Sequence, residues 1–139
     1  MDIEITRITA ENASLLDEVA EDVFDDEVRP EWVAAYVASP GHVLVVAVRD
    51  GVVVGQGAAV IHRHPDQPTE LYVDNMGVTP ALWRQGIGGR LLDALFQIGR
   101  DLGCEEAWLG TEPDNAEALA LYRSRKGPER LATIFEWSF

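Results

Sequence analysis

The hydrophobic pattern of the first 78 residues is mostly that of β-strands. Residues 3–8 alternate apolar and polar side chains, which predicts a first strand. Residues 42–48 and 52–62 are rich in β-branched side chains and flank Asp50-Gly51, a turn signal, so they predict an antiparallel hairpin. Residues 69–78 predict the next strand.

Helical spacing appears before the hairpin and after the last of these strands. Apolar residues after Asn12 predict a helix over residues 15–23, and Pro30 suits the first turn of a second helix. We expect the acidic segment between these two helices to be mobile. The longest helix follows the glycines at 86–89, and its apolar positions are Leu91, Leu95, Ile98 and Leu102.

The last third of the chain predicts a strand, a helix and a final strand. Residues 105–111 form a β-α-β unit with the preceding strand and helix, which implies parallel pairing. Asp114, with Glu117 three residues later, resembles a capping box that opens the last helix. Residues 132–139 alternate as a strand. Its aromatic side is expected in the core or in a subunit interface, so a homodimer is plausible: Phe135, Trp137 and Phe139.

These elements predict an α/β (α+β) fold in one domain over residues 1–139, with a mixed, mostly antiparallel sheet of six to seven strands and about four helices. No apolar run approaches the roughly 18 residues that a membrane span needs, so no membrane partner is expected. The acidic start Met1-Asp2-Ile3-Glu4 does not resemble a secretory leader, and the single Cys104 cannot form an internal disulfide. A cytoplasmic location is therefore expected.

The charge of the chain favours cationic partners. The formal net charge is −13, which makes nucleic acid an unfavourable partner, because phosphate backbones require clustered Lys and Arg. Carboxylates concentrate between Glu11 and Glu31, where Arg29 is the one basic residue. A solvated acidic surface and a binding surface for a cationic substrate both fit this pattern.

The sequence Trp83-Arg84-Gln85-Gly86-Ile87-Gly88-Gly89 joins a predicted strand to the longest helix. The first N–H groups of a helix have no intrahelical partners, and the helix dipole adds partial positive charge there. This junction is therefore a candidate phosphate site. It lacks the P-loop ending Gly-Lys-Ser/Thr and the Gly-x-Gly-x-x-Gly spacing of dinucleotide sites.

Together with the order of elements, Val78-Thr79-Pro80 before Gly86-Ile87-Gly88, and Asn115 before Leu121-Tyr122, resemble the GNAT superfamily of N-acetyltransferases. Within it, the runs Glu70-Leu71-Tyr72-Val73 and Glu21-Asp22-Val23-Phe24-Asp25 resemble the aminoglycoside 3-N-acetyltransferase subgroup. Short runs on a shared fold identify the acetyl donor better than the acceptor.

The resemblance implies acetyl-CoA as cosubstrate, with a groove opened where the fourth strand splays from the fifth. The pantetheine arm would pair with main chain of the fourth strand, and the pyrophosphate would lie at the helix start. The cofactor-binding residues are then Met76, Gly77, Val78, Arg84, Gln85, Gly86, Ile87, Gly88, Gly89 and Asn115. For Asn115, helix capping is an equal alternative.

The resemblance also implies that the Val78 N–H is the oxyanion donor and that the Tyr122 phenol is the general acid for the departing thiolate. Core packing is the alternative for Tyr122. Asp74 and Glu70, four residues apart on the same strand face, are candidates for the base, acting through a raised pKa or a water relay, or for binding the cationic substrate. The candidate substrate-binding residues are Asp25, Asp26, Glu27, Trp32 and Glu112.

Three further features limit these assignments. His62 and His64 share a strand end, but the sequence places no third ligand beside them, so we expect solvated histidines and no metal. Trp83 stands where the family usually has Gln or Arg, so Arg84 is the alternative phosphate contact. For Trp32 and Tyr36, one helical turn apart, core packing is favoured over a wall of the acceptor site.

The predicted function is an acetyl-CoA-dependent N-acetyltransferase that transfers acetyl directly to a small cationic amine in a ternary complex. An aminoglycoside is the leading acceptor. Polyamines, lysine side chains and peptide N-termini satisfy the same electrostatics. A non-catalytic acyl-CoA-binding module is the alternative class, against which the presence of Tyr122 argues.

Overall fold

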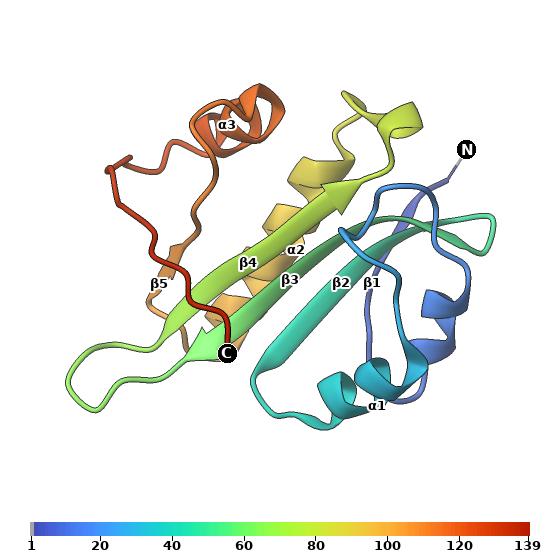
Figure 1. The fold of residues 1–139 in the computed structure, drawn as a ribbon, viewed down its shortest axis with the longest axis horizontal. Helices are drawn as coiled ribbons and strands as arrows, with labels where there is room; N and C mark the ends of the chain where they lie inside the picture. Colours follow the sequence, from blue (N-terminus) through green and yellow to red (C-terminus); the bar gives the residue numbers. More distant parts are fainter. Residues whose placement is uncertain (1) are drawn as a thin grey trace.

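A five-stranded sheet in the order β1-β2-β3-β4-β5 forms the centre of the computed structural model, which describes residues 2–139 (Figure 1). β1 to β4 are antiparallel and β5 is parallel to β4, so the predicted hairpin and the β-α-β unit are confirmed. The strands are β1 (Glu4–Arg7), β2 (His42–Arg49), β3 (Val52–His62), β4 (Glu70–Val78) and β5 (Glu106–Trp108).

Helices cover both faces of this sheet, and the sheet separates two hydrophobic cores. α2 (Ile87–Asp101) packs on one face, where its buried leucines meet the valines of β2, β3 and β4. α1 (Pro30–Ala38) lies on the opposite face, together with a short 3-10 helix, η1 (Ala13–Asp17) (Figure 1). We call this the α1 face. α3 (Ala116–Ser124) lies beyond the outer side of β4, and a second 3-10 turn, η2 (Pro80–Leu82), follows β4.

The helix predicted over residues 15–23 is wrong, so the described chain has three α-helices and not four. Only η1 forms, and the chain then runs extended beside β3, where Val53 N–H donates to Glu18 O and Ala20 N–H donates to Val53 O, both at 2.8 Å. Val23 is buried against the sheet. Pairing with β3 therefore overrides the helical spacing of the apolar residues.

The final strand predicted over residues 132–139 is also wrong, and the sheet has five strands in place of six to seven. Residues 125–139 form no helix or strand, and the Phe135 and Trp137 side chains are 73% and 77% exposed. The neighbouring edge strand, β5, is three residues long and offers few main-chain groups for pairing. The aromatic residues therefore lie outside the core of the chain.

β4 carries a bulge and a close crossing on the α1 face. Its register with β3 shifts between Ala58 and Ala59, so that Asp74 is the extra residue. Three residues later, the main chain of Val23 passes directly over Gly77, where a methyl group would lie 2.1 Å from the Val23 carbonyl oxygen. Gly77 is thus a point of close main-chain approach, and the bulge lies before it.

α3 begins at Asn115, so the capping box predicted at Asp114 is wrong by one residue. The Asn115 side-chain oxygen accepts a hydrogen bond from the Ala118 N–H at 3.2 Å, while the Asp114 main-chain carbonyl bonds to the Ala116 N–H. An Asn side chain at this position satisfies one of the N–H groups that the helix leaves open. Helix capping is therefore a role that the structure assigns to Asn115.

Asn115→Ala is expected to destabilise the protein by about 1 kcal/mol because the cap is lost. The free energy of unfolding, measured in urea, and hydrogen exchange at the Ala118 amide will report this loss. The matched control is Asp114→Ala, which removes a neighbouring exposed side chain that makes no cap. Equal losses for both variants would contradict the assignment of the cap to Asn115.

Candidate functional site

The main chain of β4 is open on one side along its second half. β4 pairs with β5 through Glu70, Leu71 and Tyr72, and this pairing stops there although β4 continues to Val78. β3 pairs with β4 along the other side as far as Val78. Residues 73–78 therefore present main-chain N–H and C=O groups toward the space between β4 and β5. This is the splayed geometry that the sequence predicted.

The orientation of Val78 follows from its neighbour. The Thr79 N–H donates to the Val54 carbonyl of β3 at 2.9 Å. Because main-chain groups alternate in direction along a strand, the N–H groups of Val78 and Met76 point to the open side. On that side, the Trp83 indole donates to the Val78 carbonyl at 2.7 Å. Trp83 thus bonds the carbonyl of Val78 and leaves the N–H of Val78 available.

The helix start beside this edge has the properties of an anion site. Gly86 precedes α2 with φ of +80°, a left-handed conformation that glycine adopts without strain. No side chain caps this helix, and its first bond runs from the Arg90 N–H to the Gly86 carbonyl, so the N–H groups of residues 87–89 precede the ladder. Ile87 is buried and Gln85 is exposed. Gly86 is exposed at the helix start, whereas Gly88 is half-buried and Gly89 is buried beside the Arg125 guanidinium.

Three elements meet at the first turn of α2. A methyl group on Gly88 would lie 3.2 Å from Leu121 of α3 and 4.0 Å from Val78 of β4. Arg125, at the end of α3, makes two 2.9 Å hydrogen bonds to Asp93 of α2. Arg84 bonds to Glu117 of α3 at 2.7 Å. These contacts hold α3 against the helix start, and they engage Arg84, the residue expected to contact phosphate.

Tyr122 lies in this contact zone. It is half-buried, and it packs against the apolar cluster on the α2 side of the sheet. Burial raises the pKa of its phenol above the usual value. The phenol is therefore a proton donor at neutral pH. This position next to Leu121 is compatible both with packing and with proton donation.

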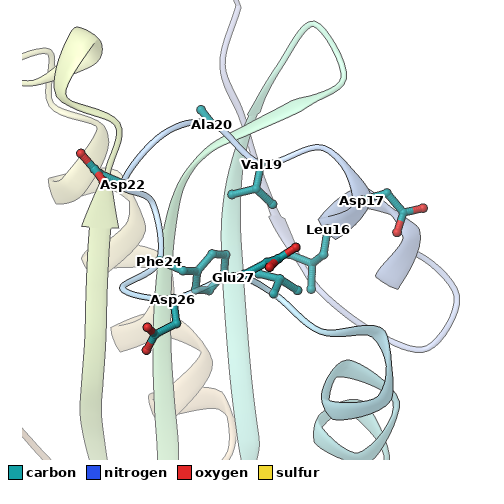
Figure 2. A pocket seen from close by; sticks show the side chains of 9 residues that line it. Leu16, Asp17, Val19, Ala20, Asp22, Phe24, Asp26 and Glu27 are labelled. Carbon is teal, nitrogen blue, oxygen red and sulfur yellow. The ribbon is translucent and has the colours of Figure 1, made fainter.

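The acidic segment before α1 forms a pocket on the α1 face (Figure 2). Its volume is about 320 Å³. Figure 2 shows Asp22 beside the end of β4, where the segment crosses Gly77. The pocket is lined by the apolar residues Leu16, Val19, Ala20, Phe24 and Val28 and by the acidic residues Asp17, Asp22, Asp26 and Glu27.

The structure separates the other residues expected to bind substrate. Asp26 and Glu27 line the pocket, whereas Asp25 is exposed and does not. Trp32 is 62% exposed beneath the Arg29 guanidinium, so the core packing favoured for it is wrong. Glu112 is exposed just before α3, where its carbonyl accepts from the Asn115 N–H.

Asp74 and Glu70 both lie on the α1 face, at different points of β4. The negative charge of Asp74 contributes, after burial, to raising the pKa of Tyr36 to about 12, which places Asp74 near α1. Glu70 is bonded to His64 at 2.5 Å. Eight residues separate Glu70 from Val78, a distance of about 26 Å along a strand. Asp74 is thus the nearer of the two to the open end.

Sequence reasoning missed Gln56, which is fully buried on the α1 face. Its amide nitrogen donates to the Val23 carbonyl at 3.3 Å and to the Asn75 side chain at 3.1 Å. Gln56 therefore ties the acidic segment to the end of β4. A polar residue in the middle of an otherwise apolar strand was the available signal, because a buried amide costs free energy unless it is bonded; the Gln56 amide nitrogen is bonded, whereas its oxygen has no partner among residues 2–139.

Comparison with known proteins agrees with this geometry. The model of the acetyltransferase (GNAT) family matches residues 9–127. The chain is 35% identical over 125 residues to the N-alpha-acetyltransferase RimI of Mycobacterium tuberculosis strain H37Rv, covering 88% of this chain and 76% of that protein.

Solved structures share the fold at lower identity. An aminoglycoside acetyltransferase from an uncultured soil metagenomic sample superimposes with a TM-score of 0.83 at 22% identity, covering 100% of this chain and 99% of that one. The aminoglycoside acetyltransferase AAC(6')-Iy, in complex with a bisubstrate analogue, superimposes with a TM-score of 0.81 at 18% identity, covering 100% and 99%. AAC(6')-Iy is a 6'-enzyme, so it does not support the narrower resemblance to the 3-N subgroup.

The residues present fit a CoA thioester. The open edge of β4 offers main-chain partners to an amide-bearing arm, and the uncapped start of α2 offers N–H groups to a pyrophosphate. No helix in residues 2–139 is long and apolar enough to cross a membrane. The family match covers most of the chain. The chain therefore belongs to the acetyltransferase (GNAT) family and is an acetyl-CoA-dependent N-acetyltransferase.

Proposed function

We propose that this enzyme acetylates a primary amine of a small polycationic acceptor, with an aminoglycoside as the leading candidate. The observation that carries the proposal is the concentration of carboxylates on the α1 face: Asp22, Asp26 and Glu27 around the pocket, and Asp74 on β4. In a protein of net charge −13, such a surface attracts and orients a multiply charged amine.

In the proposed mechanism, bound acetyl-CoA would supply the acetyl thioester. Residues of the chain orient the acceptor amine and protonate the leaving sulfur. The Val78 N–H, which faces the open edge of β4, holds the oxygen that gains negative charge. The Tyr122 phenol donates a proton to the leaving sulfur. Asp74 binds the ammonium of the acceptor, and a water relay to this carboxylate accepts the proton that the amine must lose before attack.

The residues proposed to hold the cosubstrate act mainly through main chain. Met76 and Val78 pair with its arm, and the N–H groups of residues 87–89 bind the pyrophosphate. Gly77, Gly86 and Gln85 belong to the same surface. The Arg84 guanidinium is exposed and exchanges Glu117 for phosphate in this proposal, because an exposed ion pair contributes only about 0–1 kcal/mol.

Tyr122→Phe is expected to lower kcat about 100-fold and to leave the KM for acetyl-CoA unchanged, since the ring stays and only the proton donor is removed. Because burial raises the Tyr122 pKa, loss of rate through Tyr122 ionisation should set in at a higher pH than for a free phenol. Steady-state kinetics, followed by the release of free thiol, will measure kcat, the KM for acetyl-CoA and the pH dependence of the rate.

The matched control is Tyr72→Phe, which keeps the ring that stacks on Trp108 at 4.3 Å and should stay near the wild-type rate. An unchanged kcat in Tyr122→Phe would remove the general-acid role. It would leave the family assignment intact.

The acceptor proposal predicts that rate follows acceptor charge. A panel of an aminoglycoside, spermidine, a peptide with a free N-terminus and a neutral-bodied monoamine should give the highest kcat/KM with the aminoglycoside, falling as ionic strength rises. Asp22→Asn and Asp26→Asn should each raise the KM for the aminoglycoside up to about fivefold. Each removes one exposed ion pair with an ammonium group of the acceptor, and such a pair contributes about 0.2–1 kcal/mol. Asp101→Asn, at the far end of α2, is the control.

Equal kcat/KM across the panel, or effects of Asp101→Asn as large as those of the pocket variants, would refute a charge-selected acceptor. Preference for the peptide would select the second candidate, a protein N-terminus. That candidate is favoured by the 35% identity to an N-alpha-acetyltransferase, which exceeds the 22% identity to the aminoglycoside acetyltransferase from the soil sample.

We further propose that two copies of the chain associate through residues 131–139. The exposed side chains of Phe135 and Trp137 stack on each other at 6.3 Å, and together with Leu131 and Ile134 they form an apolar surface. Apolar surface of this kind marks protein interfaces. A second copy is the proposed partner, because a segment of alternating apolar residues can pair with its own equivalent.

Light scattering should give a dimer mass for the wild type and a monomer mass for Phe135→Ser/Trp137→Ser. Trp32→Ser, which removes an aromatic side chain of similar exposure on α1, should leave the dimer intact. A monomeric wild type at micromolar concentration would contradict this proposal.

A further inference from the structure

His62, His64 and Glu70 converge at the end of the sheet opposite the acetyl-transfer site. His62 ends β3, Glu70 begins β4, and the two residues are register partners, while His64 lies in the connection between the strands. His64 Nε2 lies 2.5 Å and His62 Nδ1 3.7 Å from the same oxygen, Oε1 of Glu70. One ligand atom from each residue lies within 4.8 Å of the others.

We propose that these three residues bind a divalent transition metal ion, with zinc as the reference ion. Zinc in proteins takes His nitrogen and carboxylate oxygen at about 2.0–2.2 Å, which separates tetrahedral ligands by about 3.3 Å. The observed separations bracket that value. A tetrahedral zinc ion held by these three residues would take a water molecule as its fourth ligand.

The surroundings of the three side chains allow this adjustment. Glu70 and His64 are 17% and 19% exposed and are held near the sheet, whereas His62 is 53% exposed and has room to rotate. Among residues 2–139, neither imidazole has a hydrogen-bond partner other than Glu70. The two rings lie 4.1 Å apart and are tilted by 42°, and one nitrogen of each lies near the same oxygen of the Glu70 carboxylate.

The donor set selects the class of ion. Two imidazoles and one carboxylate suit zinc, cobalt, nickel and copper, whereas magnesium and calcium prefer oxygen ligands throughout. The net charge of −13 raises the local concentration of any cation. Bound metal would fix residues 63–69 to the sheet, because ligands lie on both sides of this connection.

The structure adds a third candidate ligand, Glu70, to the two histidines. In the sequence, Glu70 lies six positions after His64, and two histidines without a third ligand predict no metal site. The antiparallel hairpin of β3 and β4 brings Glu70 opposite His62. The third donor is thus supplied by strand register and not by sequence spacing.

The experiment titrates untagged, chelator-treated full-length protein with zinc chloride by calorimetry, and with cobalt chloride followed by visible absorption. We expect one zinc ion per chain with micromolar or tighter affinity and the cobalt spectrum of a four-coordinate site. His62→Ala and His64→Ala should each weaken zinc binding at least about tenfold, the loss typical even of residues that only support a ligand. Glu70→Gln should weaken it as well.

The control is His42→Ala, because His42 packs on the Tyr36 ring at the start of β2 and completes the three histidines of the chain. Circular dichroism will show whether each variant is folded. Absence of zinc binding by the folded wild type at millimolar zinc would overturn the proposal. Binding that His62→Ala and His64→Ala leave unchanged, or that His42→Ala weakens equally, would overturn it too.

Discussion

The parallel pairing of β4 with β5 ends after three residue pairs, and the active site depends on that early end. If β5 followed β4 to Val78, the N–H groups of Met76 and Val78 would be used within the sheet. Because the strands separate, these groups stay open, and an open strand edge must be solvated or bonded by something else. Trp83 bonds the Val78 carbonyl, and the remaining edge is the part of β4 that we propose to bind the pantetheine arm of the cosubstrate.

A second constraint joins the acidic segment to the same strand end. The main chain of Val23 crosses Gly77 so closely that no side chain fits, and the Gln56 amide bonds the Val23 carbonyl from below. The carboxylates at 22, 26 and 27 are therefore positioned by backbone contacts and not by their own hydrogen bonds. Acceptor recognition can change there through side-chain substitution, while the crossing at Gly77 keeps the segment next to the site of transfer.

The sequence predicts best those elements whose local signals and tertiary surroundings agree. The β2–β3 hairpin has a turn signal between two β-branched runs, and α2 has strong helical spacing and ends before Gly103, so both are confirmed. Residues 15–23 have helical spacing too, but after η1 ends at Asp17, hydrogen bonds of Glu18 and Ala20 to Val53 hold the chain extended. The aromatic residues 135, 137 and 139 alternate as in a strand, yet a strand needs a neighbour, and neighbours are invisible in a local pattern. Glu70 and His64 show the same limitation, because only strand register brings them together.

The two ends of β4 thus have different chemistry on one rigid strand. The Val78 end carries main-chain groups, which side-chain substitution leaves in place, and the fold is shared with TM-scores above 0.8 by two aminoglycoside acetyltransferases of only 22% and 18% identity. The α1 face of the strand, from Glu70 to Asp74, carries side chains that a change of acceptor can alter without disturbing the groove. A metal ion at the Glu70 end would add rigidity to the acceptor face alone, because about 26 Å of strand separates it from the thioester groups. In the proposed mechanism, donor binding is therefore a property of the backbone, and acceptor choice is a property of the side chains on the α1 face.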